Sequence, residues 1–421
     1  MELPPYRRLA FEGPAGTGKT HELLAALVGL LDQLPLLPHQ RVLALTYMHG
    51  SRRRLDARLA LLPLLKKRYL VQTIDAFAAA LVHRRRSLAR TLGLAPSTFD
   101  DTCAAAARIA GHPSVAAWVA ASFPIILVDE FQDVDVPRLN LIQAFSNAAH
   151  ILVGADEFQC LNPFLLPSAA VQWMHEVFQV TPLQQPRRTA DHGLLRAAHA
   201  IRAGASPAIG GGFAIVVPPG PGASAYCIAQ AIAKHPRGTI AIISPSLAGP
   251  MPEILSRLRN ADGKINQFGK FHIRQESTSQ ESVASLMTSC QLTDRRDLQR
   301  CIAELAATAD PQLCRLSDWL RRKQSVSPIS ELTNDMIKDR LELILHQTRS
   351  FGASQERGIL AATVHGAKNR EFDGVVVFWP FAIPKDPEQR RRLLYNAVTR
   401  AKSWCTVVLF SKKLMGEVPF A

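Results

Sequence analysis

The chain has 421 residues, of which 47% are hydrophobic, and a formal net charge of +14. This length allows two or three domains with cores of their own. The longest stretch without a charged residue, 203–233, is interrupted by glycine and proline, which excludes a membrane-spanning helix. The excess of positive charge indicates a polyanionic partner.

The cysteines and histidines indicate which disulfides and metal sites the chain can form. The seven cysteines are scattered without a CxxC pair, so we expect neither a disulfide framework nor a zinc site. The 13 histidines show no ligand spacing, which leaves Mg²⁺ as the metal that we expect. The first residues lack the basic-then-apolar order of a secretory signal, so a cytoplasmic protein without a membrane partner is expected.

A glycine-rich loop follows the first apolar strand, Leu9–Glu12. Residues 13–20 read GPAGTGKT, the pattern of a phosphate-binding loop that opens a helix. Backbone N–H groups of such a loop point at phosphates, Lys19 adds a positive charge, and the Thr20 hydroxyl is a ligand for Mg²⁺. The nucleotide-binding residues that we expect here are Gly13, Pro14, Ala15, Gly16, Thr17, Gly18, Lys19, Thr20 and His21.

A carboxylate pair follows a second apolar strand. Ile125–Val128 has the continuous apolar pattern of a buried parallel strand, and Asp129 and Glu130 come directly after it. Asp129 is expected to hold Mg²⁺ with Thr20, and Glu130 to orient the attacking water. The loop and the carboxylate pair together predict nucleotide hydrolysis.

Strands alternate with helical stretches in two blocks, which predicts an α/β fold with parallel sheets. We expect a first core at 1–180 with a short insertion at about 80–122, a second core at 181–260 and 357–421, and a small helical insertion at 261–356. The expected strands are 9–12, 41–46, 125–128 and 151–153, then 212–217, 238–244, 358–364, 374–378 and 405–410.

Basic residues are concentrated in triplets. A single triplet is also what a solvated helix face shows, whereas several triplets beside hydrolysis motifs favour a nucleic-acid track. The triplets are 52–54, 66–68, 84–86, 321–323 and 390–392.

Seven further motifs occur in one order along the chain: LTYMH with the following 51–59, TIDAF at 73–77, DEFQD at 129–133, ADEFQ at 155–159, 183–189, 363–373, and LYNAVTRAK at 394–402. In this order they resemble the motifs of the UvrD/Rep/PcrA type of superfamily 1 helicase. The resemblance implies two RecA-like P-loop cores with small helical insertions. It also implies ATP or another NTP with Mg²⁺, and single-stranded or partly duplex DNA as partner.

The resemblance also implies roles for individual residues. Gln159 is expected to sense the γ-phosphate, and Arg188 and Arg400 to stabilise the transferring phosphoryl group together with Lys19 and Glu130. Further nucleotide contacts are expected from Arg187, Asn369 and Glu371. Nucleic-acid contacts are expected from Tyr47, Arg53, Thr73, Phe164 and His365, where Phe164 also fits a core aromatic.

Several positions depart from the family pattern. No glutamine precedes the loop, His21 stands where an arginine is usual, and Arg187 replaces a tyrosine that stacks on the base. A guanidinium plane can also stack on a purine, so base binding is retained in this interpretation while selectivity for ATP over GTP is open. Asn369 replaces a glycine, and asparagine is the residue that best tolerates the positive φ of that turn.

The insertions between motifs are short compared with UvrD relatives. This leaves two functions open. The first is a DNA-stimulated ATPase that translocates 3′ to 5′ and unwinds duplex. The second is an NTP-hydrolysing regulatory subunit that binds a separate nuclease without unwinding, as in two-component antiviral systems such as Gabija, which the compact architecture resembles.

Overall fold

The computed structural model describes residues 6–47, 49–96, 98–276, 283–284, 286–288, 298–308, 310–326, 337–338, 340–341, 344–345, 358–381 and 383–421. These residues form two compact units. The larger unit comprises 1–274 with 358–421, and the smaller unit comprises 275–357. Of the seven cysteines, Cys290 lies outside the described residues.

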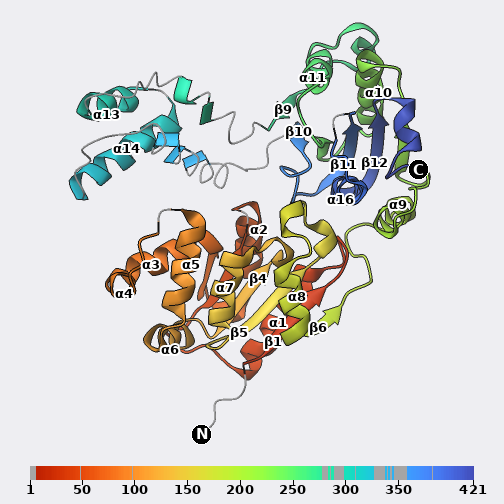
Figure 1. Cartoon of the computed structure of the whole chain (residues 1–421). Helices are drawn as coiled ribbons and strands as arrows, with labels where there is room; N and C mark the ends of the chain where they lie inside the picture. The colour runs from red at the N-terminus through yellow and green to blue at the C-terminus, as the bar shows by residue number, and fades with distance from the viewer. Residues whose placement is uncertain are drawn as a thin grey trace. The chain divides into compact units, whose positions relative to one another are not determined.

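The first sheet of the larger unit has six parallel strands in the order β3-β2-β4-β5-β1-β6 (Figure 1, red to yellow-green). Its strands are β1 Arg8–Glu12, β2 Val42–Thr46, β3 Tyr69–Thr73, β4 Ile125–Asp129, β5 His150–Ala155 and β6 Gln179–Pro182. Its helices are α1 Lys19–Gln33, α2 His49–Ala60, α3 Ile74–Arg84, α4 Arg86–Thr91, α5 Phe99–Ala110, α6 Pro113–Ser122, α7 Val136–Phe145 and α8 Ala169–Val177. Short 3₁₀ turns are η1 Pro63–Leu65, η2 Phe131–Asp133, η3 Glu157–Gln159 and η4 Pro163–Leu165.

Both faces of the first sheet are buried. Along β4, Ile125 and Leu127 pack with α1 and α2, whereas Ile126 and Val128 pack with α3, α5 and α7 on the other face. Successive side chains of a strand point to opposite faces, so a continuous apolar run fills two helical layers. In Figure 1, α3 and α5 lie side by side on the second of these faces.

The second sheet of the larger unit has the order β7-β12-β11-β8-β10-β9, and β7, β12, β11, β8 and β10 pair in parallel. Its strands are β7 Phe213–Val216, β8 Ile240–Ser244, β9 Ile273–Gln275, β10 Ile359–Thr363, β11 Phe372–Trp379 and β12 Ala401–Leu409. Its helices and turns are α9 His192–Ala203, α10 Pro221–Ala233, α11 Met251–Asn260, η5 Gly263–Phe268, α16 Pro387–Val398 and η6 Lys412–Gly416.

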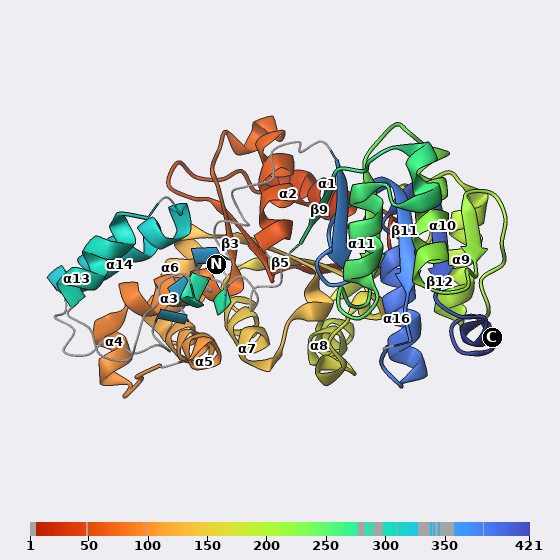
Figure 2. The same cartoon turned by 90° about the horizontal axis from the view of Figure 1, so that it is seen from above.

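The second sheet is also covered on two faces. Along β8, Ala241 and Ile243 pack with α9 and α16, whereas Ile240 and Ile242 pack with α10 and α11. α10 and α11 lie side by side (Figures 1 and 2). Two parallel sheets with helices on both faces confirm the predicted α/β fold with two cores. Among the described helices, none is long and apolar enough to span a membrane.

The nine expected strands are all present, with ends shifted by a few residues. Three strands were missed: β3, β6 and β9. β6 pairs in parallel with β1, so the first sheet extends two residues beyond the boundary expected at residue 180. The expected insertion near 80–122 consists of the end of α3 with α4, α5 and α6.

The smaller unit contains α13 Leu298–Ala306 and α14 Pro311–Val326. The two helices contact each other, and their apolar residues form one core. The buried residues include five leucines of this unit: Leu286, Leu305, Leu313, Leu316 and Leu320. The unit begins at residue 275, because α11 and η5 pack with the second sheet.

Candidate functional site

The glycine-rich loop joins β1 to α1. Gly16 and Gly18 have φ of 81° and 89°, a left-handed conformation that glycine adopts without a Cβ clash. A Cβ on Gly13 would lie 2.4 Å from the carbonyl oxygen of Leu183. The glycines are therefore required by the backbone path that turns the loop into the N-terminus of α1.

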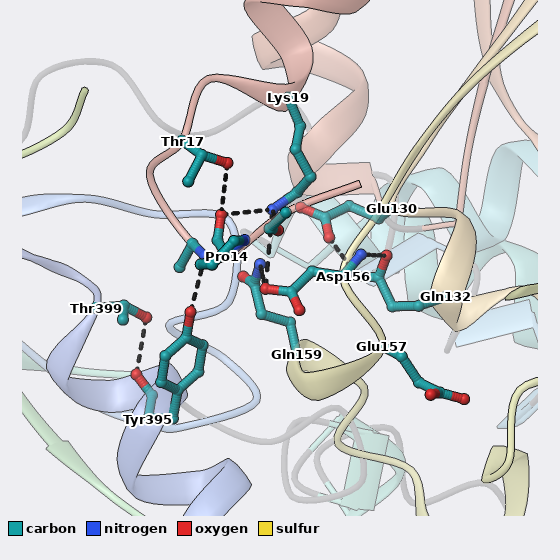
Figure 3. A network of polar contacts seen from close by, with 12 residues as sticks. Pro14, Thr17, Lys19, Glu130, Gln132, Asp156, Glu157, Gln159, Tyr395 and Thr399 are labelled. Atoms are coloured by element: carbon teal, nitrogen blue, oxygen red, sulfur yellow. Dashed lines mark hydrogen bonds and ion pairs between the residues drawn. The ribbon is translucent and has the colours of Figure 1, made fainter. Parts of the chain in front are cut away.

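Lys19 is folded back onto the loop (Figure 3). Its Nζ donates to the carbonyl oxygens of Gly13 at 2.8 Å and Pro14 at 3.0 Å, and it lies 3.9 Å from Oδ2 of Asp156. Burial lowers the pKa of Lys19, while Asp156 acts in the opposite direction. Lys19 thus has three oxygen neighbours inside the protein, two of which belong to the loop itself.

Thr20 and Asp129 offer adjacent oxygen atoms. The Thr20 hydroxyl donates to Oδ2 of Asp129 at 3.2 Å, and the N–H of Glu130 donates to Oδ1 at 3.1 Å. Burial and the neighbouring Glu130 raise the pKa of Asp129 to about 6. A hydroxyl and a carboxylate this close are hard oxygen donors of the kind that Mg²⁺ prefers, so the pair fits this ion.

Glu130 has a left-handed backbone with φ of 58°. Such a conformation costs a non-glycine residue about 1 kcal/mol or more and is found mainly at functional sites. Nε2 of Gln132 donates to Oε2 of Glu130 at 2.6 Å. Burial opposes ionisation, but the charges of Lys368 and Lys19 lower the pKa of Glu130, which keeps the carboxylate charged.

Two arginines of the sequence analysis lie beside this carboxylate pair. The NH2 group of Arg400 donates to Oε1 of Gln159 at 3.1 Å, and its Nε donates to the carbonyl of Asn396. Burial and the nearby Arg188 lower the pKa of Arg400 to about 10. NH1 of Arg188 donates to the carbonyl of Thr399 at 2.7 Å, and its NH2 lies 3.1 Å from Oε1 of Glu371.

These side chains line one cavity of about 470 Å³. It brings together residues of the first core, Gly16, Gly18, Lys19, Thr20, His21, Asp129, Glu130 and Gln159, with Arg187, Arg188, Asn369, Glu371 and Arg400. Gly13 does not line it. Pro14, Ala15 and Thr17 line a second cavity of about 380 Å³ instead, which Tyr395 also lines.

Sequence analysis missed four residues that line the larger cavity: Ser51, Arg54, Leu55 and Arg58. All four belong to α2. Arg54 and Arg58 are four residues apart, so they lie on one helix face, and this spacing was the available signal. Arg54 pairs with Glu371, and Arg188, Arg54 and Lys402 lower the pKa of Glu371 to about 2 against the effect of burial.

Sequence analysis also missed a polar network behind the cavity (Figure 3). The N–H of Asp156 donates to Oε1 of Gln132 at 3.0 Å, and Nε2 of Gln159 donates to Oδ2 of Asp156 at 2.8 Å. The N–H of Ala15 donates to the Tyr395 hydroxyl at 2.8 Å. Glu130, Gln132, Asp156, Gln159 and Arg400 are thereby joined through consecutive hydrogen bonds.

A buried ion pair joins the two cores. Nζ of Lys368 lies 2.7 and 2.6 Å from the two carboxylate oxygens of Asp133, and it also donates to the carbonyl of Gln159 at 3.1 Å. The two side chains are 5% and 9% exposed. Both residues lie within quoted motifs, but their pairing is a long-range contact that neither motif indicates.

Three departures from the family pattern line the cavity: His21, Arg187 and Asn369. Asn369 has φ of 64°, which confirms the positive φ expected at this turn, and its Nδ2 donates to Oγ of Ser51 at 2.6 Å. NH2 of Arg187 lies 2.7 Å from Oε1 of Glu22, and a Cβ on Gly18 would lie 3.0 Å from Cδ of Arg187. Arg187 is therefore held across the start of α1.

None of the five expected nucleic-acid residues lines the larger cavity. Thr46 pairs with Thr73 and with Asp129 in neighbouring strands, so Tyr47 and Thr73 lie at the same carboxyl edge of the sheet as the cavity. Thr73 is buried and caps α3, accepting from the N–H of Ala76 at 3.2 Å. The guanidinium of Arg138 lies 5.7 Å from the centre of the Tyr47 ring.

The other three expected nucleic-acid residues differ in exposure. Phe164 in η4 is 94% exposed. His365 is also exposed, whereas Arg53 is half-buried. The exposure of the Phe164 ring excludes the alternative of a core aromatic for this residue.

The basic triplet 390–392 makes contacts within the protein. Arg390 pairs with Glu417 and Arg391 with Glu388, each at 2.8 Å or less. The guanidinium groups of Arg391 and Arg392 lie 5.5 and 5.0 Å from the centre of the Phe158 ring. This triplet therefore has internal partners for its charge.

Comparisons with known proteins agree with this geometry. Residues 358–408 match the model of the UvrD-like helicase C-terminal domain, and residues 6–164 match that of an AAA domain. No curated protein matches the chain. Among the described residues, no group of three or more His, Cys, Asp or Glu side chains is placed to hold a metal ion.

Solved structures similar to the chain include the Arterivirus nonstructural protein 10 helicase. Its complex with DNA aligns at a TM-score of 0.39 and 12% identity over 98% of this chain, and a second crystal structure aligns at 0.39 and 12% over 97%. The chain spans 63% and 61% of their lengths. The two family models thus make the chain similar to UvrD-like helicases in its C-terminal part and to an AAA domain in its N-terminal part, and together they indicate an NTP-hydrolysing enzyme of the UvrD-like helicase type.

Proposed function

We propose that the chain hydrolyses ATP in the 470 Å³ cavity and uses the cycle of hydrolysis to move along single-stranded DNA in the 3′ to 5′ direction. The observation that carries the proposal is the composition of that cavity. It gathers a loop lysine, a carboxylate pair and five arginines, of which Arg400 comes from the second core. Phosphoryl transfer needs this combination of positioning and positive charge.

In this proposal the triphosphate replaces the internal partners of Lys19. The Nζ that now donates to the carbonyls of Gly13 and Pro14 turns to the β- and γ-phosphates. Thr20 and Asp129 hold Mg²⁺, which neutralises charge on the phosphate oxygens when bound. The loop N–H groups and the N-terminus of α1 bind the remaining phosphate charge.

Glu130 and the arginines act on the terminal phosphoryl group. The ionised Glu130, fixed by Gln132, accepts a hydrogen bond from the attacking water and orients it. Arg188 and Arg400 stabilise the charge that develops on the transferring group. Gln159 accepts a hydrogen bond from Arg400 of the second core. The presence or loss of the γ-phosphate at Gln159 therefore changes a contact between the two cores.

The nucleic-acid side of the proposal rests on the carboxyl edge of the first sheet. Tyr47 and the exposed Phe164 offer rings for base stacking, and Arg53, Thr73 and His365 contact the backbone or position these rings. The net charge of +14 favours a polyanion. DNA rather than RNA is the proposed partner because the motifs resemble those of UvrD-type DNA helicases.

A regulatory subunit of a nuclease-containing defence complex is the second candidate. Two observations favour it: only α4, α5 and α6 lie between α3 and β4, and Arg187 occupies the position of the base-stacking aromatic. In this candidate the same cavity hydrolyses NTP, but the energy drives assembly with a separate nuclease subunit rather than unwinding.

Hydrolysis assays with and without single-stranded DNA separate the two candidates. A translocase hydrolyses ATP faster with DNA, loses the stimulation as salt rises, and is inactive as Lys19→Ala. Comparison of ATP with GTP tests the altered base site in the same assay. Hydrolysis that is indifferent to DNA would contradict translocation, and absence of Lys19-dependent hydrolysis would contradict both candidates.

A further inference from the structure

One arginine outside the quoted motifs joins the second core to the loop lysine. Arg202 lies near the end of α9, whose Leu194, Ala197 and Ile201 pack in the core of the second sheet. Its NH1 lies 2.7 Å from Oδ1 of Asp156, a residue that directly follows β5 of the first sheet. The contact therefore joins the two cores immediately behind the phosphate-binding loop.

The Asp156 carboxylate is fully buried and has three neighbours. Its Oδ1 faces Arg202, while its Oδ2 accepts from Nε2 of Gln159 at 2.8 Å and lies 3.9 Å from Nζ of Lys19. A buried carboxylate requires a cationic partner, because its desolvation is costly otherwise. Arg202, at 2.7 Å, is the closer of two cationic partners, and Lys19, at 3.9 Å, is the other.

Arg202 is held in this position by two aromatic rings. Its guanidinium lies 5.2 Å from the centre of the Phe158 ring and 5.7 Å from that of Tyr395. Phe158 follows Asp156 in the chain by two residues, and its ring packs with Tyr395 of α16 in the core of the second sheet. The guanidinium plane is thus fixed by both cores, which a flexible surface arginine would not be.

We propose that Arg202 is a positioning residue that keeps Lys19 available for nucleotide. By satisfying the Asp156 carboxylate, Arg202 prevents that carboxylate from drawing Lys19 away from the loop. Because Arg202 comes from the second core, nucleotide affinity in the first core then depends on contact between the two cores. The inference rests on the proposed binding of triphosphate by Lys19, and it adds a specific regulator of that binding.

Removal of Arg202 should weaken nucleotide binding. In Arg202→Ala, the closest remaining cation to the Asp156 carboxylate is Lys19, so Lys19 shifts toward Asp156. The Kd of the non-hydrolysable analogue Mg-adenylyl imidodiphosphate, measured by calorimetry, should rise about ten- to hundredfold, the loss expected for one charge-assisted hydrogen bond. The rate at saturating ATP should fall less than the affinity does.

A second substitution distinguishes positioning from a structural role. Arg202→Ala combined with Asp156→Asn removes the carboxylate that competes for Lys19, so the Kd should return to within about threefold of the original protein. A structural role predicts the opposite, because the second change removes a further native contact. Arg202→Lys keeps a cation for Asp156 and should retain most of the affinity.

Arg196→Ala serves as the matched control, because Arg196 is an exposed arginine on the same helix α9. It should leave the Kd unchanged, and circular dichroism melts should show every variant folded at the assay temperature. The proposal is overturned if Arg202→Ala binds the analogue normally, or if the double variant binds as weakly as Arg202→Ala. If the original protein neither binds the analogue nor hydrolyses ATP, the proposed function itself fails instead.

Discussion

The two cores of the larger unit share a fold but differ in the charged residues that they contribute where they meet. The first core contributes the phosphate-binding loop and the acidic residues Asp129, Glu130, Asp133 and Asp156. The second core contributes cations to these residues or to the same cavity: Lys368 to Asp133, Arg202 to Asp156, and Arg400 beside Gln159. The difference indicates that the first core alone has a binding loop without the charges that complete a hydrolysis site.

The largest effect that this comparison predicts is on turnover. Arg400→Ala removes a second-core charge while the loop and the carboxylate pair stay in place. Arginine fingers contribute about 10³- to 10⁵-fold to rate in related chemistry, so ATP hydrolysis should fall by at least about 10³-fold. Steady-state kinetics measures the rate of hydrolysis, and binding of a non-hydrolysable ATP analogue measures the affinity. A fall in affinity as large as the fall in rate would show that Arg400 binds the nucleotide rather than stabilising the transition state.

The next effect belongs to the first core. Glu130→Gln keeps the size of the side chain but removes the charge that orients water, so the rate should fall about 10²- to 10⁴-fold. Binding of the analogue should persist, because Glu130 is not expected to contact the phosphates. Residual hydrolysis near the original rate would exclude Glu130 as the orienting carboxylate.

Stability provides a third test, on the contact between the cores. Lys368→Met leaves the buried Asp133 carboxylate without its ion-pair partner, which should lower the free energy of unfolding by about 3–5 kcal/mol. In Lys368→Met with Asp133→Leu, both charges are gone and much of that loss should be recovered. Denaturant unfolding measures both, and equal stability of all three proteins would show that the pair does not hold the cores together.

The smallest predicted effect concerns the nucleic-acid side. Phe164→Ala removes an exposed ring, and one stacked base contributes about 1–3 kcal/mol. The concentration of single-stranded DNA needed for half-maximal stimulation should rise accordingly, with hydrolysis in the absence of DNA unchanged. Phe381, exposed on the second core, provides the matched control Phe381→Ala. Equal effects of both changes would remove Phe164 from the proposed DNA contact.

Much of the fold could be predicted because its signals are local. Continuous apolar runs identified the central strands. The glycines of the loop and Asn369 indicated turns with positive φ, because glycine and asparagine are the residues that best tolerate this conformation. β6 was missed because Gln179–Pro182 is polar and mostly exposed, with no apolar run to mark it. β3 has only alternating burial along five residues, a weaker signal than a two-sided strand.

Site residues that depend on long-range packing could not be predicted. Arg202 belongs to no quoted motif, and its importance arises only when α9 places it against Asp156. The triplet 390–392 has the composition of a nucleic-acid track, yet α16 turns Arg391 and Arg392 toward the ring of Phe158. The density of basic residues along the chain does not indicate whether a carboxylate or an aromatic ring from another segment will contact their side chains.

The most direct test of the account is a crystal structure with Mg-adenylyl imidodiphosphate bound. The account predicts the γ-phosphate within hydrogen-bonding distance, about 3 Å, of Lys19 and of the guanidinium groups of Arg188 and Arg400. A nucleotide bound to the loop with both arginines far from its terminal phosphate would contradict a hydrolysis site made by two cores.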